Sequence, residues 1–384
     1  MKMLFLIGEL YGEGAGASED LFRVIEGLKN RYEDFDYFII THRYLYPSPK
    51  FPINKVLLWP RYYSSALGDR RLQKKIMEYD MVYIRQTLEY VLPSIRSGKR
   101  VIFNLPHVDE LSMLRGKTKF LAFFTRMMIH PLLKNVDIVI TATPEFSSVL
   151  LNKFNIKSIV VPDIVGDIWL SAIERRRRRR ISTGVDVNLI HVGDFELDGR
   201  KRTGQLLNVI RGALESYPKL KLRMVGMNKY KSYLASKYAE NLGIEENVII
   251  EDHLLSEEQL LEEYTKSDIY VTTTTYEGFY RPIIEAFMTG MPAIVYDARL
   301  ITHNQGIIAQ VNHVLKSGAG LLFDGTVTSF LEALREIIKN YNYYSEKAVE
   351  YSYQFKSERI IDKYQKIIDH LRNGHNGAKG LAKL

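Results

Sequence analysis

Residues 272–292 read T-T-T-T-Y-E-G-F-Y-R-P-I-I-E-A-F-M-T-G-M-P, and this stretch decides the fold. The run D-I-Y-V precedes it at residues 268–271, and the apolar run A-I-V-Y follows it at residues 293–296. Pro282 stands where the first residue of a helix would stand, a position at which the missing backbone donor costs nothing. The stretch therefore predicts a strand, a loop, a helix and a second strand, which is the repeating unit of a parallel sheet.

Two acids in this unit predict the chemistry of a site. Glu277 and Glu285 lie eight positions apart across the junction of loop and helix, and the flexible Gly278 follows the first acid. The free backbone N–H groups of a helix start can hold an anion such as a phosphate, and a carboxylate can accept hydrogen bonds from a pair of hydroxyls. The helix dipole alone also favours an acid near a helix start, so a structural role for Glu285 is the alternative.

The same alternation of strand and helix runs through the rest of the chain. Its 384 residues are 46% hydrophobic and 26% charged, a balance that favours a globular protein with two domains. A first alternating series ends near residue 168, and a second begins at residue 187 with V-N-L-I-H-V-G. The fold class is therefore α/β, with parallel sheets covered by helices and ligands bound at the carboxyl ends of the strands.

The string from Glu277 onward resembles the donor-site signature of retaining glycosyltransferases of family 4. In that family E-G-F-G-x-P-x-x-E-A is followed by a small residue, Gly, any residue, Pro and an apolar strand. The residues that match are Glu277, Gly278, Phe279, Pro282, Glu285, Ala286, Gly290 and Pro292. The departure is Tyr280, where the family usually has Gly, and we expect its side chain to narrow the sugar pocket or to reshape the loop.

The resemblance implies a role for each residue of the motif. Glu277 is expected to be catalytic, facing the hydroxyls of the donor sugar or acting electrostatically near the reacting carbon. Glu285 is expected to accept hydrogen bonds from the ribose of the nucleotide. The backbone N–H groups of Phe279, Tyr280 and Arg281, beside Gly278, are expected to approach the phosphate or the sugar.

The loop at residues 193–204 reads G-D-F-E-L-D-G-R-K-R-T-G and is expected to neutralise the leaving group. A departing nucleoside diphosphate gains negative charge, which fixed cations stabilise. The family carries an Arg and a Lys here, in the form G-R-x-x-x-x-K-G, but Asp194 occupies the usual Arg position. We expect Lys201 and Arg202 to supply the charge, with Arg281 as a substitute, and a merely solvated basic loop is the alternative.

The first half of the chain resembles the family more weakly. The loop at residues 8–20 is rich in glycine but lacks the G-x-G-x-x-G spacing of dinucleotide-binding proteins. The resemblance implies that Gly14 and Gly16 line a cleft close to the donor. His107, in N-L-P-H-V-D-E, follows a predicted strand and is expected to be catalytic near the donor sugar, although a lone histidine is often structural. Asp109 and Glu110 are further candidates for positioning an acceptor hydroxyl.

The resemblance implies the GT-B fold, in which two Rossmann-like, doubly wound domains face each other across a cleft. The expected order is an acceptor-side domain at 1–168, an arginine-rich linker at 169–186, a donor-nucleotide-binding domain at 187–342, helices that cross back to the first domain at 343–371, and a flexible tail at 372–384.

Two segments raise the question of further partners. The net charge is +8, and the six arginines at residues 175–180 account for most of it, since 8 − 6 = +2. We expect this run to be a solvated linker, with an anionic membrane surface as the alternative partner at about 1 kcal/mol per Arg. Nucleic acid is not expected, because no aromatic residues interleave with the run. The apolar segment at residues 117–133 is expected to be a buried helix, with insertion into a membrane surface as the alternative.

The absence of cysteine excludes disulfides and thiolate metal sites, and no spacing of His and Asp suggests another metal site. We therefore expect a metal-independent, retaining glycosyltransferase without a cofactor, located in the cytoplasm or peripherally at the membrane. Its donor would be a nucleotide-diphosphate sugar, and its acceptor a carbohydrate, lipid-linked or protein hydroxyl. A GT-B sugar-nucleotide epimerase and a non-catalytic nucleotide-sugar-binding protein are the alternatives, and Asp194 and Tyr280 keep the second one open.

Overall fold

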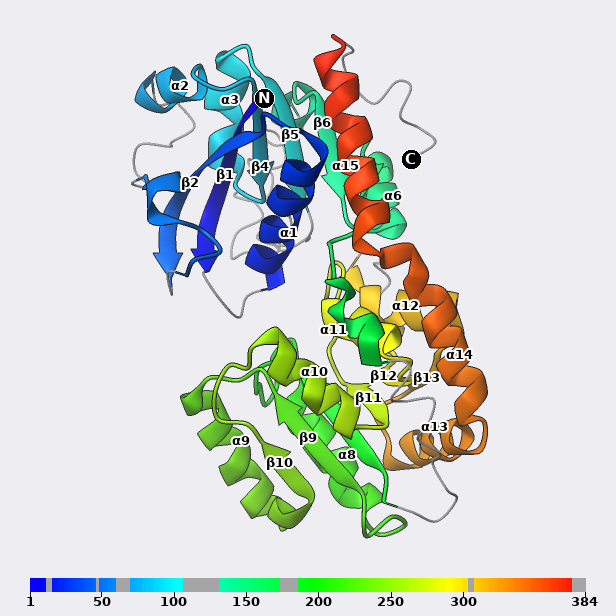
Figure 1. Ribbon diagram of the computed structural model, residues 1–384. Helices are drawn as coiled ribbons and strands as arrows, with labels where there is room; N and C mark the ends of the chain where they lie inside the picture. Colours follow the sequence, from blue (N-terminus) through cyan, green and yellow to red (C-terminus); the bar gives the residue numbers. More distant parts are fainter. Residues whose placement is uncertain are drawn as a thin grey trace. The chain divides into compact units, whose positions relative to one another are not determined.

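A computed structural model describes residues 1–11, 16–45, 48–59, 70–105, 131–172, 186–302 and 307–374 (Figure 1). The chain divides into two compact units. Unit 1 comprises Met1–Ile164 together with Ser357–Leu384, and unit 2 comprises Val165–Lys356. Each unit is built around one parallel sheet, as the alternating sequence pattern predicts.

Unit 1 contains a seven-stranded sheet in the order β3-β2-β1-β4-β5-β6-β7. The strands are β1 (Lys2–Tyr11), β2 (Asp36–Leu45), β3 (Val56–Leu58), β4 (Met81–Arg85), β5 (Arg100–Leu105), β6 (Ile138–Thr141) and β7 (Ile159–Val160). The longer helices are α1 (Gly16–Arg31), α2 (Arg70–Ile76), α3 (Val91–Arg96), α6 (Pro144–Phe154) and α15 (Ser357–Arg372). Every strand pairing is parallel, so the chain crosses back over the sheet between consecutive strands.

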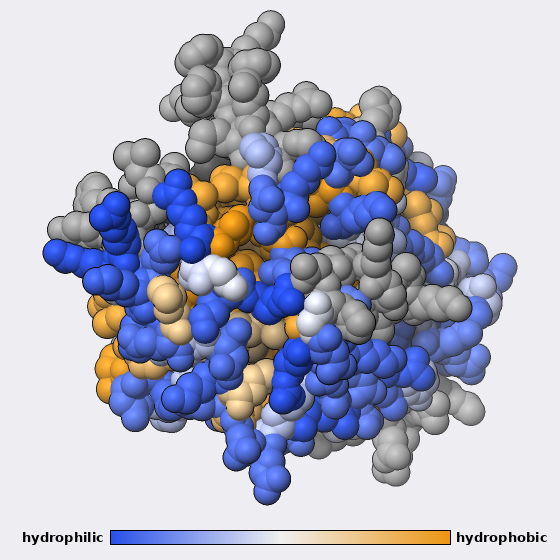
Figure 2. All heavy atoms as spheres, turned by 90° about the horizontal axis from the view of Figure 1, so that it is seen from above, coloured by the Kyte–Doolittle hydropathy of each residue, from blue (hydrophilic) through white to orange (hydrophobic). Residues whose placement is uncertain are grey.

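The two faces of this sheet are buried in separate apolar clusters. Along β1, Met3, Phe5 and Ile7 belong to the cluster that contains residues of α1 and α15. Leu4 and Leu6, which point to the opposite face, belong to the cluster that contains residues of α2, α3 and α6. Burial on both faces explains why β1 is an almost continuous apolar run. On the face of the molecule seen in Figure 2, polar and charged side chains surround smaller areas of apolar ones.

Helix α15, the last helix of the described chain, packs on α1 (Figure 1). Gly27 lies at the closest approach, because a Cβ atom at this position would overlap the side chain of Ile361. At the edge of the contact, Arg31 donates to the carboxylate of Asp362 at 2.5 Å. Unit 1 is therefore completed by a segment that is distant in sequence.

Unit 2 contains a six-stranded parallel sheet in the order β10-β9-β8-β11-β12-β13. The strands are β8 (Asn188–Val192), β9 (Lys221–Val225), β10 (Val248–Ile250), β11 (Ile269–Thr272), β12 (Ala293–Tyr296) and β13 (Gly320–Phe323). The helices are α8 (Thr203–Ala213), α9 (Lys229–Leu242), α10 (Glu257–Lys266), α11 (Arg281–Met288), α12 (Ala309–Ser317), α13 (Val327–Lys339) and α14 (Tyr341–Ser352). The strand order reverses direction between β8 and β11, which makes this pair the switch point at which ligands of such sheets bind.

Two predicted boundaries differ from the observed units. Helix α14 packs on α11 inside unit 2, so the chain returns to unit 1 at Ser357 and not at residue 343. Trp169, at the start of the predicted linker, is buried in unit 2 and donates from Nε1 to Glu257 at 3.1 Å. Its large apolar ring explains the difference, since exposing it to solvent would be unfavourable.

Several predicted features lie outside the described residues. These are the arginine run at 175–180, most of the apolar segment at 117–133 and the end of the tail at 375–384. No helix in the part of the chain that the structure describes combines the length and the apolarity needed to cross a membrane.

Candidate functional site

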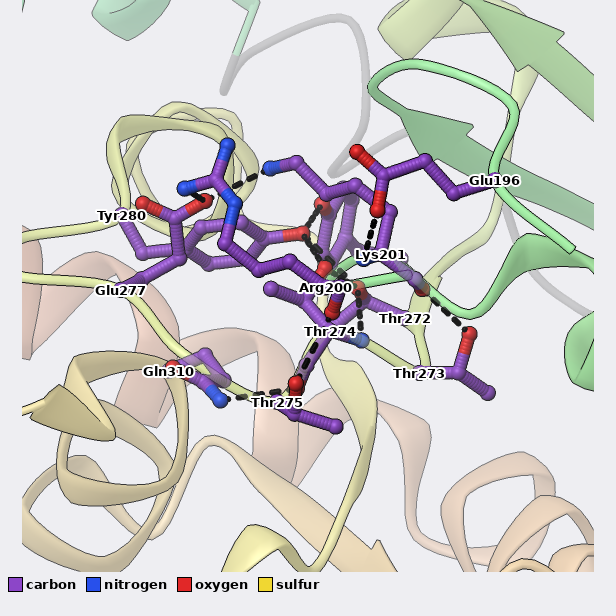
Figure 3. Close-up of polar contacts among 11 residues, drawn as sticks. Glu196, Arg200, Lys201, Thr272, Thr273, Thr274, Thr275, Glu277, Tyr280 and Gln310 are labelled. Carbon is purple, nitrogen blue, oxygen red and sulfur yellow. Dashed lines mark hydrogen bonds and ion pairs between the residues drawn. The ribbon is translucent and has the colours of Figure 1, made fainter. Parts of the chain in front are cut away.

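The candidate site of unit 2 lies where β8 and β11 end side by side. The loop after β8 is tied to the threonines that follow β11 (Figure 3). Thr273 Oγ1 donates to the carbonyl oxygens of Lys201 at 3.0 Å and Arg202 at 2.9 Å. The backbone N–H and the hydroxyl of Thr275 both donate to the carbonyl of Arg200, at 2.9 and 3.0 Å. The backbone of residues 200–202 is therefore fixed to the start of the acidic motif.

This attachment brings two cations to the first acid of the motif (Figure 3). Lys201 Nζ lies 2.7 Å from Oε1 of Glu277, and Arg200 Nη1 lies 2.8 Å from the same oxygen. The Glu277 and Lys201 side chains are 9% and 11% exposed, whereas that of Arg200 is 40% exposed. Burial opposes the charge of Lys201, but the Glu277 carboxylate, which also accepts its hydrogen bond, and Tyr280 together outweigh burial and raise the pKa of Lys201 above its usual range.

The backbone of Glu277 is also fixed. Its N–H donates to the carbonyl of Ile307 at 2.6 Å, and its own carbonyl accepts from the N–H of Ala309 at 3.1 Å. These bonds form an isolated parallel bridge beside the start of α12. Nearby, Gln310 donates from its amide nitrogen to the carbonyl of Thr274 at 2.8 Å. The position of the carboxylate therefore depends on α12 as well as on the motif itself.

Tyr280 occupies the left-handed backbone region, with φ 63° and ψ 67°, directly before α11. This conformation explains why the family usually has Gly here, because only Gly adopts it without a Cβ penalty. The Tyr280 side chain is buried, and its ring centroid lies 5.0 Å from Lys201 Nζ. Its hydroxyl lies 2.7 Å from that of Tyr270 and 2.8 Å from that of Thr272. The ring therefore points into unit 2, which favours the expectation that Tyr280 reshapes the loop over the expectation that it narrows the sugar pocket.

Glu285, the second acid, is buried on α11. Its Oε2 accepts from the Tyr264 hydroxyl at 3.1 Å, and Arg281 lies 3.6 Å from its other oxygen. Burial and the Glu285 charge raise the pKa of Tyr264 well above its usual range, so Tyr264 stays a donor. Trp169 packs edge-on against Tyr264 with ring centroids 5.1 Å apart. Arg281 is therefore engaged with the second acid of the motif.

Phe279 is part of the core of unit 2, and its carbonyl is held by His313. The imidazole Nε2 donates to this carbonyl at 2.8 Å, which leaves Nδ1 to accept from the Tyr351 hydroxyl at 3.0 Å. The Phe279 ring packs edge-on against Phe355, with centroids 5.7 Å apart. Gly278 beside it is also buried. His313 of α12, together with Tyr351 of α14, thus fixes the backbone of the motif loop.

The three cations of the basic loop do not all point in one direction, and which of them meets the diphosphate stays a prediction. Arg202, itself left-handed at φ 47°, lies with its guanidinium 4.9 Å from the ring centroid of Tyr296. Arg200 and Lys201 are the two that reach Glu277. Asp194, at the family's usual Arg position, is exposed. The structure therefore brings Lys201 and Arg200 together at Glu277, while Arg202 lies over the ring of Tyr296.

Several residues that shape this site are not predicted by the sequence pattern. They are Arg200, Thr273, Thr275, Tyr264, Gln310 and His313. Only the run of four threonines carries a visible signal, because hydroxyl groups directly after a strand are suited to hold a neighbouring loop. The others are spread over distant parts of the chain.

The candidates of unit 1 are only partly described. Gly16 is the first residue of α1, whereas Gly14, His107, Asp109 and Glu110 lie outside the described residues. A cavity of about 270 Å³ lies at the carboxyl ends of β1 and β4, and Ser18, Arg85 and Gln86 contribute to its lining. The guanidinium of Arg85 is paired with the buried carboxylates of Asp20 and Asp163. The charge of Arg85 is therefore balanced within unit 1.

Within the described ranges no three His, Asp or Glu side chains are grouped as a metal site would require. The absence of a metal from the reaction stays a prediction.

Two Rossmann-like units, each built around one parallel sheet, are the architecture of the GT-B class of fold. Residues 186–355 match the family model described as glycosyl transferases group 1. This match covers most of unit 2. No curated protein matches the sequence.

Solved structures resemble the chain over nearly its whole length. Alr3699/HepE from Anabaena, solved in complex with UDP, has a TM-score of 0.69 at 16% identity, with 97% of this chain and 100% of that one covered. A glycosyltransferase from Rickettsia africae has a TM-score of 0.70 at 14% identity, with 97% and 99% covered. The lipopolysaccharide outer core galactosyltransferase WaaB has a TM-score of 0.67 at 15% identity, with 97% and 100% covered. At these identities the likeness concerns the fold, and it confirms the predicted fold class.

Proposed function

We propose that the protein is a glycosyltransferase that moves a sugar from a nucleotide-diphosphate sugar to an acceptor hydroxyl. In this proposal the configuration at the sugar carbon is retained, and neither a metal ion nor a cofactor takes part. The observation that carries it is the pairing of Lys201 and Arg200 with Glu277 at the switch point of the sheet. The match of residues 186–355 to glycosyl transferases group 1 supports it.

The two cations suit the charge that develops in such a reaction. The bond between the sugar carbon and the diphosphate oxygen breaks, and a bond to the acceptor oxygen forms on the same face of the sugar. The leaving phosphate takes the acceptor's proton. Negative charge on the leaving diphosphate is met by Lys201 and Arg200, and preorganised groups of this kind typically contribute several kcal/mol in total.

The two acids take separate roles in this proposal. Glu277, held between two cations, faces the hydroxyls of the donor sugar. Glu285, held in place by Tyr264 and Arg281, accepts hydrogen bonds from the ribose, because a carboxylate presents two oxygens to a vicinal diol. The two acids therefore do not act as an acid and base pair.

The UDP present in the solved structure of Alr3699/HepE makes a UDP-sugar the first donor to test. The acceptor hydroxyl belongs to a carbohydrate, a lipid-linked molecule or a protein. We propose the cytoplasm, or its membrane surface, as the place of the reaction.

The test begins with a thermal-shift panel of UDP-, GDP- and ADP-sugars, followed by transfer assays with the donor that binds. Lys201→Met and Glu277→Ala are expected to lower kcat by about 10²- to 10³-fold, the typical effect of removing one preorganised group. Lys229→Met, on the exposed surface of α9, is the matched control and should stay within about twofold of the wild type.

Three outcomes have different meanings. NMR of the product identifies its anomeric configuration, and inversion would contradict the proposed retention. Wild-type turnover by both site variants would contradict the site. Failure of every nucleotide sugar to bind would contradict the function as a whole.

A further inference from the structure

The residue that departs from the family motif, Tyr280, has an unfavourable backbone. Among the described residues only Gln86, Asn155, Arg202 and Tyr280 have positive φ without being glycine. A side chain with a Cβ atom is disfavoured in this region, and such strain persists only where other contacts impose it. The Tyr280 side chain must therefore make contacts that a glycine would lack.

Those contacts begin at the hydroxyl. It lies 2.7 Å from the hydroxyl of Tyr270, 2.8 Å from that of Thr272 and 3.2 Å from that of Thr274. All four side chains are buried, so water does not compete for these hydrogen bonds. A tyrosine side chain has only two torsions, and anchoring its far end leaves the ring a single orientation (Figure 3).

The anchored ring lies next to the cation that the site depends on. Lys201 Nζ is 5.0 Å from the ring centroid, within the range of a cation–π interaction, and 2.7 Å from Glu277 Oε1. A lysine has a flexible four-carbon stem with a rotatable ammonium group. One carboxylate alone does not restrict such a group to one position, whereas the carboxylate together with the fixed ring does.

We propose that Tyr280 is a positioning residue, which holds the Lys201 ammonium beside Glu277 through its hydroxyl-anchored ring. The inference rests on the proposed function, in which Lys201 meets the leaving diphosphate. Tyr280 itself does not touch the substrate. In this chain a tyrosine therefore replaces the usual glycine to fix a cation at the start of α11.

Three variants separate the ring from the hydroxyl and from the backbone strain. Tyr280→Phe keeps the ring and removes its hydrogen bonds. Tyr280→Leu removes the ring. Tyr280→Gly removes the ring and also relieves the strain, so it supplies a folded ringless variant if Tyr280→Leu does not fold. Tyr270→Phe removes one partner of the hydroxyl and is the matched control for disturbance of the core.

The first measurement does not depend on activity. Each protein is treated with limiting acetic anhydride, and acetylation of Lys201 is measured by peptide mass spectrometry relative to that of the exposed Lys229. Loss of the ring is expected to raise the relative labelling of Lys201 by about twofold to thirtyfold, the range that corresponds to one cation–π interaction. Tyr280→Phe, which keeps the ring but loses its anchor, is expected to lie between the wild type and the ringless variants. Tyr270→Phe, which removes only one partner of the hydroxyl, is expected to stay within about twofold of the wild type.

The second measurement is transfer kinetics with the donor identified above. The ringless variants are expected to lose kcat by the same range of factors while the KM for the acceptor is unchanged. Tyr280→Phe, which keeps the ring without its anchor, is expected to lose less of its kcat than they do. A purely structural role would instead lower the melting temperature without selective labelling of Lys201. Wild-type labelling of Lys201 in a folded ringless variant would overturn the proposal.

The two proposals fail in different ways. If the wild type transfers sugar but a ringless variant labels like the wild type, only the positioning role is lost. If the wild type binds no nucleotide sugar, the function fails, and selective labelling of Lys201 still supports its placement by Tyr280.

Discussion

Substitution of Glu277 and substitution of Lys201 should lower the unfolding free energy of unit 2 by unequal amounts. Glu277→Leu leaves a Lys201 ammonium, 11% exposed, without its carboxylate, and removing one partner of a buried pair typically costs about 3–5 kcal/mol of unfolding free energy. Lys201→Met leaves Glu277 paired with Arg200, whose side chain is 40% exposed, so we expect a smaller cost of about 1–2 kcal/mol. The double variant should cost less than the sum, with a coupling of about 0.5–3 kcal/mol.

The unfolding free energy of unit 2 can be measured separately, because each unit contains one tryptophan. The two tryptophans of the chain are Trp59 in unit 1 and Trp169 in unit 2. In a Trp59→Phe background, urea unfolding followed by fluorescence reports on Trp169, which is buried against Tyr264. Equal costs for the two single variants, or simple additivity in the double variant, would refute the reasoning.

Further predictions concern other parts of the two units. Gly27→Ala should lower the unfolding free energy of unit 1, because the added methyl group would overlap Ile361. Adding Ile361→Ala to this variant should recover part of the loss, and urea unfolding of the single and the double variant checks this. Burial lowers the pKa of His191 to about 4, below its unfolded value of 6.5, so the unfolding free energy of unit 2 should fall by about 3 kcal/mol as the pH drops from 6.5 to 4. His191→Asn, which keeps a donor for the carbonyl of Val271, should flatten this dependence in unfolding curves recorded across that pH range. Thr273→Val should cost about 1 kcal/mol and reduce sugar transfer, since it releases the loop backbone; a stable variant with wild-type kinetics would argue against that role.

The elements of the motif could be predicted from local sequence. Pro282 predicted a helix start, and α11 begins at Arg281. Apolar runs on both sides predicted β11 and β12, because strands of a parallel sheet are buried on both faces. The positions of these helices and strands depend on residues close by in the sequence, so the sequence alone is sufficient to predict them.

The direction of side chains in the loops could not be predicted in the same way. In the run of Arg200, Lys201 and Arg202 the composition is nearly uniform, and the left-handed turn at Arg202 decides which side chains reach Glu277. That turn depends on hydrogen bonds from Thr273, more than seventy residues away. Tyr280 was recognised as a departure, but its direction depends on a buried hydroxyl cluster formed with Tyr270 and two threonines.

The return of the chain to unit 1 at Ser357 has a consequence for synthesis on the ribosome. The apolar face of α1 is translated before unit 2, whereas the helix that covers it, α15, is translated after unit 2. Unit 2 is complete in sequence before that helix emerges, because it ends at Lys356. Unit 1 is thus begun before unit 2 and finished after it, and a ribosome that stops before Ser357 releases a chain in which the sheet of unit 1 lacks part of its cover.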